Sequence, residues 1–267
     1  MIKEYFEFNN RPFDKDIPCE ELYSNTNNEE CMSRLEYAIK EKRFAVVTGD
    51  SGSGKTTILR KLVNKIDRNK YQAYYISDSA LTPRNFYYEI LNQMGCAAKF
   101  YRGDAKRQLH KEIWQQVEEK GRVPIIVVDE AHLLTREMLE EIRFLLNFKM
   151  DSYNPLSLIL SGQTELRETL RKQIYEAISQ RVQVRYHMQP MERKETEAYI
   201  ERHLIYAGRG IEIFSDRAID VIQDYTGGLL RKINMVCISS LLYATVQKKR
   251  VIDDYMVKYV IENELEW

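Results

Sequence analysis

Short, continuous apolar runs alternate with stretches of helical apolar spacing up to about residue 189. Short apolar runs bounded by polar segments predict strands buried on both faces, as in a parallel sheet. The alternation of strands with helices predicts an α/β fold with a parallel sheet of about five strands. Strands are expected at 44–48, 73–77, 124–128 and 156–161, with a weaker one at 183–187. Helices are expected at 29–42, 55–67, 83–94, 105–120, 133–149 and 164–180.

The pattern changes after Pro190, beyond which strand-like runs give way to helical spacing. Ser215 and Asp253 stand where helix N-caps are expected, and Gly227-Gly228 separates two helices. Near the start, prolines interrupt any regular pattern. Helices are expected at 192–207, 216–225, 229–247 and 254–264. We therefore predict an irregular segment over 1–28, an α/β domain over 29–189 and a small all-helical lid domain over 190–267.

The overall composition restricts the classes of function. Lys plus Arg and Asp plus Glu each number 40, so any surface for nucleic acid must be a local patch. The four cysteines form no Cys-x-x-Cys pair and the four histidines show no metal-ligand spacing, which argues against a disulfide or zinc framework. The charged N-terminus does not resemble a signal peptide, and the apolar stretch 235–246 is too short and polar to span a bilayer. We expect a cytoplasmic protein without membrane contact.

One segment carries a specific chemical signature. Residues 49–56 read Gly-Asp-Ser-Gly-Ser-Gly-Lys-Thr, between an apolar run and an amphipathic stretch, which is the strand–loop–helix setting of a phosphate-binding loop. The glycines allow backbone N–H groups to converge on phosphate oxygens at a helix N-terminus. Lys55 can reach the terminal phosphates, and the Thr56 hydroxyl can ligate Mg²⁺. We predict that ATP with Mg²⁺ is bound by Gly49, Asp50, Ser51, Gly52, Ser53, Gly54, Lys55, Thr56 and Thr57.

A second motif follows the apolar run 125–128, which ends in Asp129 and Glu130. An aspartate at the C-terminal end of a strand can hold Mg²⁺, and the glutamate beside it can polarise a water molecule for attack on the γ-phosphate. Between Lys55 and Asp129 there is room for an additional strand, as in the ASCE class of P-loop ATPases. The inserted strand and the glutamate favour hydrolysis of ATP over phosphate transfer to a small molecule.

Together these motifs resemble those of AAA+ ATPases. The strand at 156–161 and the residues after it resemble the sensor-1 strand, so that Gln163 or Ser161 would sense the γ-phosphate. Ser179-Gln180-Arg181 resembles the end of the helix that carries the arginine finger, which implies that Arg181 reaches a neighbouring subunit's nucleotide. Gly227 to Asn234 resembles the sensor-2 motif, with Arg231 on the phosphate. The catalytic residues implied are Glu130, Lys55, Arg181, Arg231 and Gln163.

The N-terminal pattern Phe8-x-x-x-Pro12-Phe13-x-x-x-Ile17-Pro18 is similar to the opening of ExeA-like ATPases. On these residues the chain most resembles the branch of that group that serves DNA transposition, with relatives such as MuB, IstB and TnsC. This resemblance implies a protein that oligomerises on double-stranded DNA, as a ring or helical filament, and regulates a transposase. ExeA itself carries a membrane segment and a wall-binding domain after its ATPase, and neither pattern follows here. A secretion or assembly ATPase acting on protein and a replication-type loader remain alternatives.

The segment 99–107 is the best local basic cluster, and aromatic residues are interleaved in it. Lysine and arginine neutralise phosphates, so a DNA contact is expected here, although a solvated loop entering a helix explains the cluster equally well. Residues just after the second strand form a second candidate surface, with Ser79 at its start. The DNA contacts expected are Lys99, Arg102, Lys106, Arg107, Thr82 and Arg84. For Tyr74-Tyr75 and Tyr87-Tyr88 we expect packing rather than base stacking.

Overall fold

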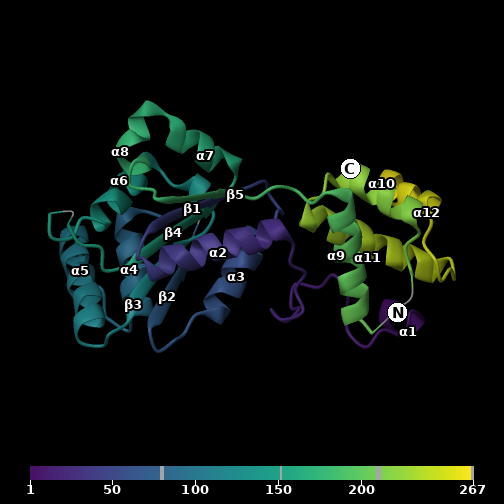
Figure 1. Ribbon diagram of the computed structural model, residues 1–267, viewed down its shortest axis with the longest axis horizontal. Helices are drawn as coiled ribbons and strands as arrows, with labels where there is room; N and C mark the ends of the chain where they lie inside the picture. Colours follow the sequence, from purple (N-terminus) through teal and green to yellow (C-terminus); the bar gives the residue numbers. More distant parts are fainter. Residues whose placement is uncertain (79–80, 151, 209–211, 266–267) are drawn as a thin grey trace. The chain divides into compact units, whose positions relative to one another are not determined.

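The structure is a computed structural model that describes residues 1–78, 81–150, 152–208 and 212–265 (Figure 1). Two compact units are present. The sheet unit comprises Asn28–Gly49 and Lys55–Met188, and the helical unit comprises Met1–Asn27, Asp50–Gly54 and Gln189–Trp267. The tip of the phosphate-binding loop therefore groups with the helical unit, while Gly49 and Lys55 at its two ends group with the sheet unit.

The sheet unit contains a five-stranded sheet whose paired strands are all parallel, in the order β2-β3-β4-β1-β5. This confirms the α/β fold and the parallel sheet predicted from the short apolar runs. The strands are β1 (Phe44–Thr48), β2 (Tyr71–Ile76), β3 (Val123–Val128), β4 (Ser157–Gly162) and β5 (Val184–His187). Because the strands are parallel, β1, β3 and β4 bring their C-terminal ends to one edge of the sheet, where ligands bind in such folds.

Helices cover both faces of this sheet (Figure 1). They are α2 (Thr26–Lys40), α3 (Lys55–Lys65), α4 (Pro83–Gln93), α5 (Arg102–Glu118), α6 (Arg136–Leu145) and α7 (Thr164–Arg171). Along β3 the side chains alternate between two cores. Val127 shares one core with α2 and α3, and Val128 shares the other with α4, α5 and α6. Asp129 follows two residues after Val127, so the alternation directs it to the face that α3 covers.

The helix predicted over 164–180 is interrupted, and the prediction of one continuous helix was wrong. After α7, Lys172 is extended, with φ −68° and ψ 138°, and the one-turn helices η2 (Gln173–Tyr175) and α8 (Glu176–Ser179) follow. Leu170 and Ile178 stay buried, whereas Ile174 between them is 50% exposed. The apolar spacing fits a single helix, but tertiary packing decides which of these side chains is covered.

The helical unit consists mainly of α9 (Arg193–Tyr206), α10 (Asp216–Thr226), α11 (Leu230–Val246), α12 (Asp254–Val260) and the π-helical turn η3 (Ile261–Leu265). The Ser215 side chain caps α10 and the Asp253 side chain caps α12, as predicted. Gly227 ends α10 in a left-handed conformation with φ 57°. A Cβ on Gly228 would lie 1.9 Å from the carbonyl oxygen of Met191, so only glycine fits where these two backbones meet.

The N-terminal segment has a short helix, α1 (Ile2–Tyr5), and packs into the core of the helical unit. Phe6, Phe8 and Phe13 are 2–3% exposed. The Phe13 N–H donates a hydrogen bond to Nδ1 of His203 at 3.0 Å, and the two rings stack. Burial, with a smaller contribution from Arg202, lowers the pKa of His203 to about 4, so its ring is neutral and can accept that bond. Sequence periodicity did not reveal this packing because the aromatic positions follow neither helical nor strand spacing.

Across the described residues, no helix combines the length and the apolar character needed to cross a membrane.

Candidate nucleotide site

The phosphate-binding loop has the backbone that its glycines allow. Gly52 and Gly54 have φ values of 82° and 95°, which side-chain-bearing residues rarely adopt. A Cβ on Gly52 would also lie 2.7 Å from the Cβ of Arg231. Lys55 is the first residue of α3 and is 7% exposed, and its Nζ donates to the carbonyl oxygen of Gly49 at 2.8 Å. The lysine ammonium is therefore folded back over the start of the loop, where phosphate groups are expected.

Asp129 lies just beyond the end of β3 and is 3% exposed. Its Oδ2 accepts hydrogen bonds from the Thr56 hydroxyl at 2.7 Å and from the Tyr75 hydroxyl at 2.9 Å. Its Oδ1 accepts from the N–H of Glu130 at 3.0 Å. The structure thus joins the two residues expected at a metal ion, Thr56 and Asp129, through one hydrogen bond. A carboxylate and a hydroxyl side by side are oxygen ligands of the kind that Mg²⁺ prefers.

Glu130 adopts a left-handed backbone conformation, with φ 51° and ψ 32°. A residue with a side chain is uncommon there, and such conformations gather at functional sites. The Glu130 carboxylate is 43% exposed and lies 3.5 Å from Nδ1 of His132, which is also 3.4 Å from the N–H of Gln163. The structure therefore brings the Glu130 carboxylate and the main-chain N–H of Gln163 to the same ring nitrogen of His132. Glu130 remains open enough to meet a water molecule.

Two buried hydroxyl groups in this region have no hydrogen-bond partner within the described residues. They belong to Ser53 in the loop, 6% exposed, and to Ser161 in β4, fully buried beside Val47 of β1. An unpaired buried hydroxyl costs free energy, so it marks a place where a ligand or water is expected. With the curled loop, Lys55 and the pair of metal-type oxygen ligands, these hydroxyls fit a triphosphate with Mg²⁺. Of the two sensor-1 candidates, Ser161 has the unpartnered group, and Gln163 occupies the N-cap position of α7 without a side-chain capping bond.

Arg231 is the second residue of α11 and lies at the tip of the loop. Its N–H donates to the Gly52 carbonyl oxygen at 3.3 Å, and its Nη1 lies 3.4 Å from the Ser51 hydroxyl.

Arg181 follows α8 in the sheet unit and is half-buried, with its N–H donating to the carbonyl oxygen of Ile178 at 3.0 Å. A contact of Arg181 with another subunit's nucleotide involves a second copy of the chain and stays a prediction.

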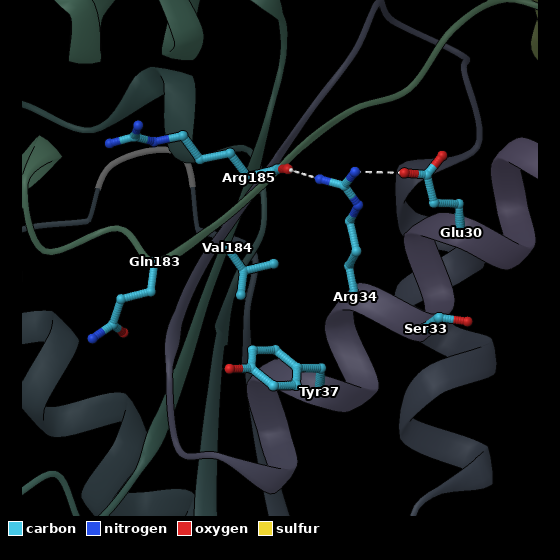
Figure 2. Close-up of a pocket in the computed structure, with 7 residues that line it drawn as sticks. All are labelled: Glu30, Ser33, Arg34, Tyr37, Gln183, Val184 and Arg185. Atoms are coloured by element: carbon cyan, nitrogen blue, oxygen red, sulfur yellow. Dashed lines mark hydrogen bonds and ion pairs between the residues drawn. The ribbon is translucent and has the colours of Figure 1, made fainter.

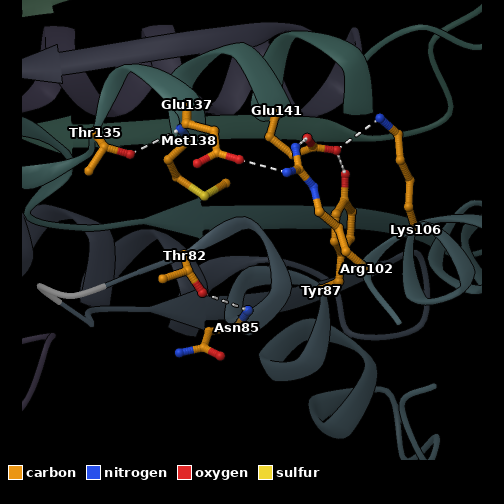
Figure 3. A network of polar contacts seen from close by, with 9 residues as sticks. All are labelled: Thr82, Asn85, Tyr87, Arg102, Lys106, Thr135, Glu137, Met138 and Glu141. Carbon is orange, nitrogen blue, oxygen red and sulfur yellow. Dashed lines mark hydrogen bonds and ion pairs between the residues drawn. The ribbon is translucent and has the colours of Figure 1, made fainter. Parts of the chain in front are cut away.

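Three of the six residues expected on DNA pair with carboxylates of the same chain, and Figure 3 shows two of them, Arg102 and Lys106. Arg102 pairs with Glu137 at 2.6 Å and also with Glu141, and Lys106 pairs with Glu141 at 2.8 Å. Arg107 pairs with Asp104 at 2.6 Å. Three of the expected cations are therefore neutralised within the sheet unit. The short segment 102–107 is part of α5 rather than an open basic loop.

The other described candidates on this surface make local contacts that involve no carboxylate. The Thr82 hydroxyl caps α4 by accepting from the N–H of Asn85 at 3.3 Å. The Arg84 guanidinium lies 4.4 Å from the ring centre of Phe100, which is 69% exposed. Lys99 is exposed, and its ammonium makes no ion pair with any described side chain. Ser79 lies outside the described residues.

Glu141 contacts residues of α4 and α5 from its place on α6. We expect its replacement by glutamine to lower stability by about 2 kcal/mol, less than for a fully buried pair because Arg102 is partly exposed. Burial raises the pKa of this carboxyl, but hydrogen bonds from Lys106, Tyr87 and Arg102 outweigh burial and hold it at about 2. A depressed pKa means that the carboxylate stabilises the fold fully above its ordinary value, 4.5, and that this contribution is lost as the pH falls towards about 2.

Denaturant unfolding at pH 7 and pH 3 measures this effect. Glu137→Gln is the matched control, because Glu137 is 63% exposed in the same network and its loss should cost less than about 0.5 kcal/mol. Equal losses in the two variants at pH 7 would show that Glu141 is not the residue that ties these helices together.

A shallow groove of about 330 Å³ lies between α2 and β5, away from these residues (Figure 2). Its walls are Glu30, Ser33, Arg34, Tyr37, Gln183, Val184 and Arg185. Arg34 donates to the carbonyl oxygen of Arg185 at 3.0 Å and pairs with Glu30 at 2.5 Å. β5 is an edge strand, and a side chain over its outer carbonyl protects it from pairing with another chain. The groove contains none of the predicted site residues.

Sequence reasoning missed Tyr75, which was expected only to pack. Tyr74 is indeed buried, whereas the Tyr75 hydroxyl reaches the carboxylate of Asp129. Tyr75 pairs in register with Val127, two residues before Asp129, so both side chains lie on the same face of the sheet. The alternation was visible in the sequence, but the neighbouring positions of β2 and β3 and their register were not.

The protein-family model described as an AAA domain matches residues 25–170. The chain therefore belongs to the AAA domain family, and the resemblance to AAA+ ATPases is confirmed.

Among curated proteins, the chain is similar to General secretion pathway protein A of Aeromonas hydrophila, with 29% identity over 252 residues. The match covers 91% of this chain and 45% of that protein, so the chain spans less than half the length of this relative.

Solved structures of the same fold include Drosophila ORC bound to DNA, with a TM-score of 0.71, 18% identity and coverage of 100% of this chain and 65% of that one. CDC6P from Pyrobaculum aerophilum has a TM-score of 0.69 and 16% identity, covering 90% of this chain and 67% of that one. The Thermotoga maritima RuvB Holliday junction branch migration motor has a TM-score of 0.61 and 19% identity, covering 97% and 72%. At these identities the likeness shows the fold alone.

Proposed function

We propose that this protein binds ATP with Mg²⁺ at the phosphate-binding loop and hydrolyses it. The observation that carries the proposal is the hydrogen bond of 2.7 Å between the Thr56 hydroxyl and the Asp129 carboxylate, at the end of β3. It brings the last residue of one motif to the first residue of the other. Membership of the AAA domain family and the unpartnered hydroxyls of Ser53 and Ser161 support the same reading.

Each residue has a role that its chemistry suits. Bound Mg²⁺ would neutralise charge on the phosphates, with Thr56 and Asp129 holding it directly or through water. Lys55 would move its ammonium from the Gly49 carbonyl oxygen to phosphate oxygens. Glu130 would accept the proton of the attacking water, and Arg231 would contact the nucleotide from the tip of the loop. Release of inorganic phosphate from ATP by the purified chain tests this assignment, and the absence of nucleotide-dependent release would contradict it.

We further propose that the nucleotide controls association between copies of the chain. In this scheme Arg181 of one copy completes the site of the next, since a guanidinium keeps its charge and spreads its donors over phosphate oxygens. A contact of this kind is head-to-tail and generates a ring or a helical filament. The AAA family match supports this scheme in general terms, and the location of Arg181 just after α8 and before β5 is compatible with it.

For the partner, a protein of a secretion or assembly system is better supported than a transposase. The curated relative is named for general secretion, and none of the relatives reported above is named for transposition. Arg102, Lys106 and Arg107, expected on DNA, already face carboxylates of their own chain. The transposition role inferred from sequence resemblance is therefore replaced by the alternative of an ATPase that acts on protein.

DNA binding can still be tested at Lys99 and Arg84, because neither side chain forms an ion pair with a carboxylate among the described residues. A solved structure of the same fold, Drosophila ORC, is bound to DNA, which is a reason to measure DNA binding here. If the target is a protein, duplex DNA should bind no more tightly with ATP than with ADP. The titration is made at about 0.15 M salt, where charges are screened over about 8 Å. Fluorescence anisotropy of labelled duplex measures this.

The variant Lys99→Glu/Arg84→Glu provides the control for that titration, with Lys65→Glu on α3 as a matched exposed site. For a protein-directed ATPase, both variants should match the parent in DNA affinity. DNA binding would again be the better proposal under two conditions: the parent binds DNA in an ATP-dependent way, and the double variant loses more than tenfold in DNA affinity while Lys65→Glu does not.

A further inference from the structure

Tyr75 makes contacts through both its side chain and its main chain. Its hydroxyl donates to Oδ2 of Asp129 at 2.9 Å. Its N–H donates to Oε1 of Gln93 at 3.1 Å, and its carbonyl oxygen accepts from Nε2 of Gln93 at 2.9 Å. Gln93 is the last residue of α4, and β2 is an edge strand of the sheet (Figure 1). The glutamine amide therefore satisfies both outward main-chain groups of Tyr75, as a neighbouring strand would.

The neighbouring tyrosine shows how specific this arrangement is. Tyr74 points to the other face of the sheet, where its hydroxyl donates to Oε1 of Gln116 at 2.9 Å. Tyr74 is 4% exposed and Tyr75 is 39% exposed. Two adjacent residues of the same type thus have separate partners, one in the core beneath α5 and one at the nucleotide site.

We propose that Tyr75 is a positioning residue for the metal ion of the nucleotide site, acting through Asp129, and that Gln93 fixes Tyr75 in place. This inference rests on the proposed nucleotide function. Asp129 receives three hydrogen bonds, from Thr56, Tyr75 and the Glu130 N–H. The Thr56 hydroxyl can turn an oxygen lone pair towards a metal ion while it still donates to Asp129. Tyr75 and the Glu130 N–H also hold the carboxylate in place, and partners of this kind orient metal ligands.

The geometry gives Tyr75 the form that the role needs, because its hydroxyl is the hydrogen-bond donor and the carboxylate of Asp129 is the acceptor. Because Gln93 ends α4, a displacement of that helix from the edge of the sheet would move Tyr75 and with it the carboxylate of Asp129.

The experiment uses Mn²⁺ as a spectroscopic stand-in for Mg²⁺. Electron paramagnetic resonance follows free Mn²⁺ during titration of the full chain with a non-hydrolysable ATP analogue. In Tyr75→Phe, which removes only the hydroxyl, the dissociation constant of Mn²⁺ should rise about tenfold, the lower end for losing a partner of a metal ligand. In Gln93→Leu it should rise less, about threefold, because the hydroxyl is retained but held less firmly. The double variant should resemble Tyr75→Phe, since both changes act through one contact.

Matched controls separate positioning from general loss of structure. Tyr74→Phe removes the hydroxyl of the adjacent residue, and Asn92→Leu changes the residue before Gln93. Both should keep the parent affinity for Mn²⁺. Binding of the ATP analogue without metal should be equal in Tyr75→Phe and the parent, because the hydroxyl contacts only the metal-holding carboxylate.

Each of the other results has a defined meaning. Equal Mn²⁺ affinity in Tyr75→Phe and the parent would overturn the inference, as would a matching loss in Tyr74→Phe or a loss of metal-free nucleotide binding in Tyr75→Phe. Full additivity in the double variant would overturn the part played by Gln93. If the parent chain binds no nucleotide, the proposed function fails first and takes the inference with it.

Discussion

Replacing Lys55 with alanine is expected to weaken ATP binding more than 100-fold, a free-energy loss of about 2.7 kcal/mol or more. Lys55 is 7% exposed at the first position of α3, and its ammonium already lies within 2.8 Å of a loop oxygen. A buried cation opposite a triphosphate gives strong charge-assisted hydrogen bonds that alanine cannot make. Isothermal titration with Mg²⁺ and ATP measures the affinity.

Lys65→Ala is the control for this prediction. Lys65 is the last residue of the same helix and pairs with Glu36 at 2.6 Å on the surface. It is therefore a lysine of α3 whose ammonium is engaged away from the loop. Its removal should change ATP affinity by less than about twofold, as for an exposed ion pair. Undiminished binding in Lys55→Ala would place the nucleotide elsewhere on the molecule.

Replacing Glu130 with glutamine should leave ATP bound and slow its hydrolysis by about 10²–10³-fold, the usual contribution of a general base. Glutamine has the same shape but cannot take a proton from water. Glu130 contacts Asp129 through its main-chain N–H, and its own carboxylate is 43% exposed and separate from the Asp129–Thr56 hydrogen bond. Copies associated through bound ATP should then stay associated, because the triphosphate persists.

Phosphate-release kinetics and light scattering after ATP addition measure both consequences. Glu119→Gln is the control, since Glu119 is an exposed carboxylate at the end of α5 that precedes β3, whereas Asp129 and Glu130 follow the other end of that strand. Rapid turnover in Glu130→Gln, close to that of Glu119→Gln, would remove Glu130 from its proposed role.

The sheet and the two nucleotide motifs could be predicted because each leaves a local pattern. Buried parallel strands read as continuous apolar runs, and the loop needs glycines at fixed positions followed by lysine and threonine. The contact between Thr56 and Asp129 follows from these patterns, since both motifs belong at the C-terminal edge of one sheet.

The contacts that were missed depend on pairings between distant parts of the chain. Arg102 and Lys106 look like a basic cluster in the sequence, but Glu141, more than thirty residues further on, pairs with both. Tyr75 meets Asp129 because β2 lies beside β3 in a particular register. A charge count in a local window cannot register a partner brought in by folding. This is why the sequence did not reveal that three of the six residues expected on DNA pair with carboxylates of their own chain.

The central claim is that the phosphate-binding loop and the Asp129–Thr56 pair form a site that hydrolyses ATP with Mg²⁺. Single-turnover release of phosphate from ATP by the purified chain, with Mg²⁺ and with the metal chelated, tests it most directly. We expect phosphate release that requires Mg²⁺ and is lost in both Lys55→Ala and Glu130→Gln. No release with Mg²⁺ present, or equal release from the parent and both variants, would contradict it.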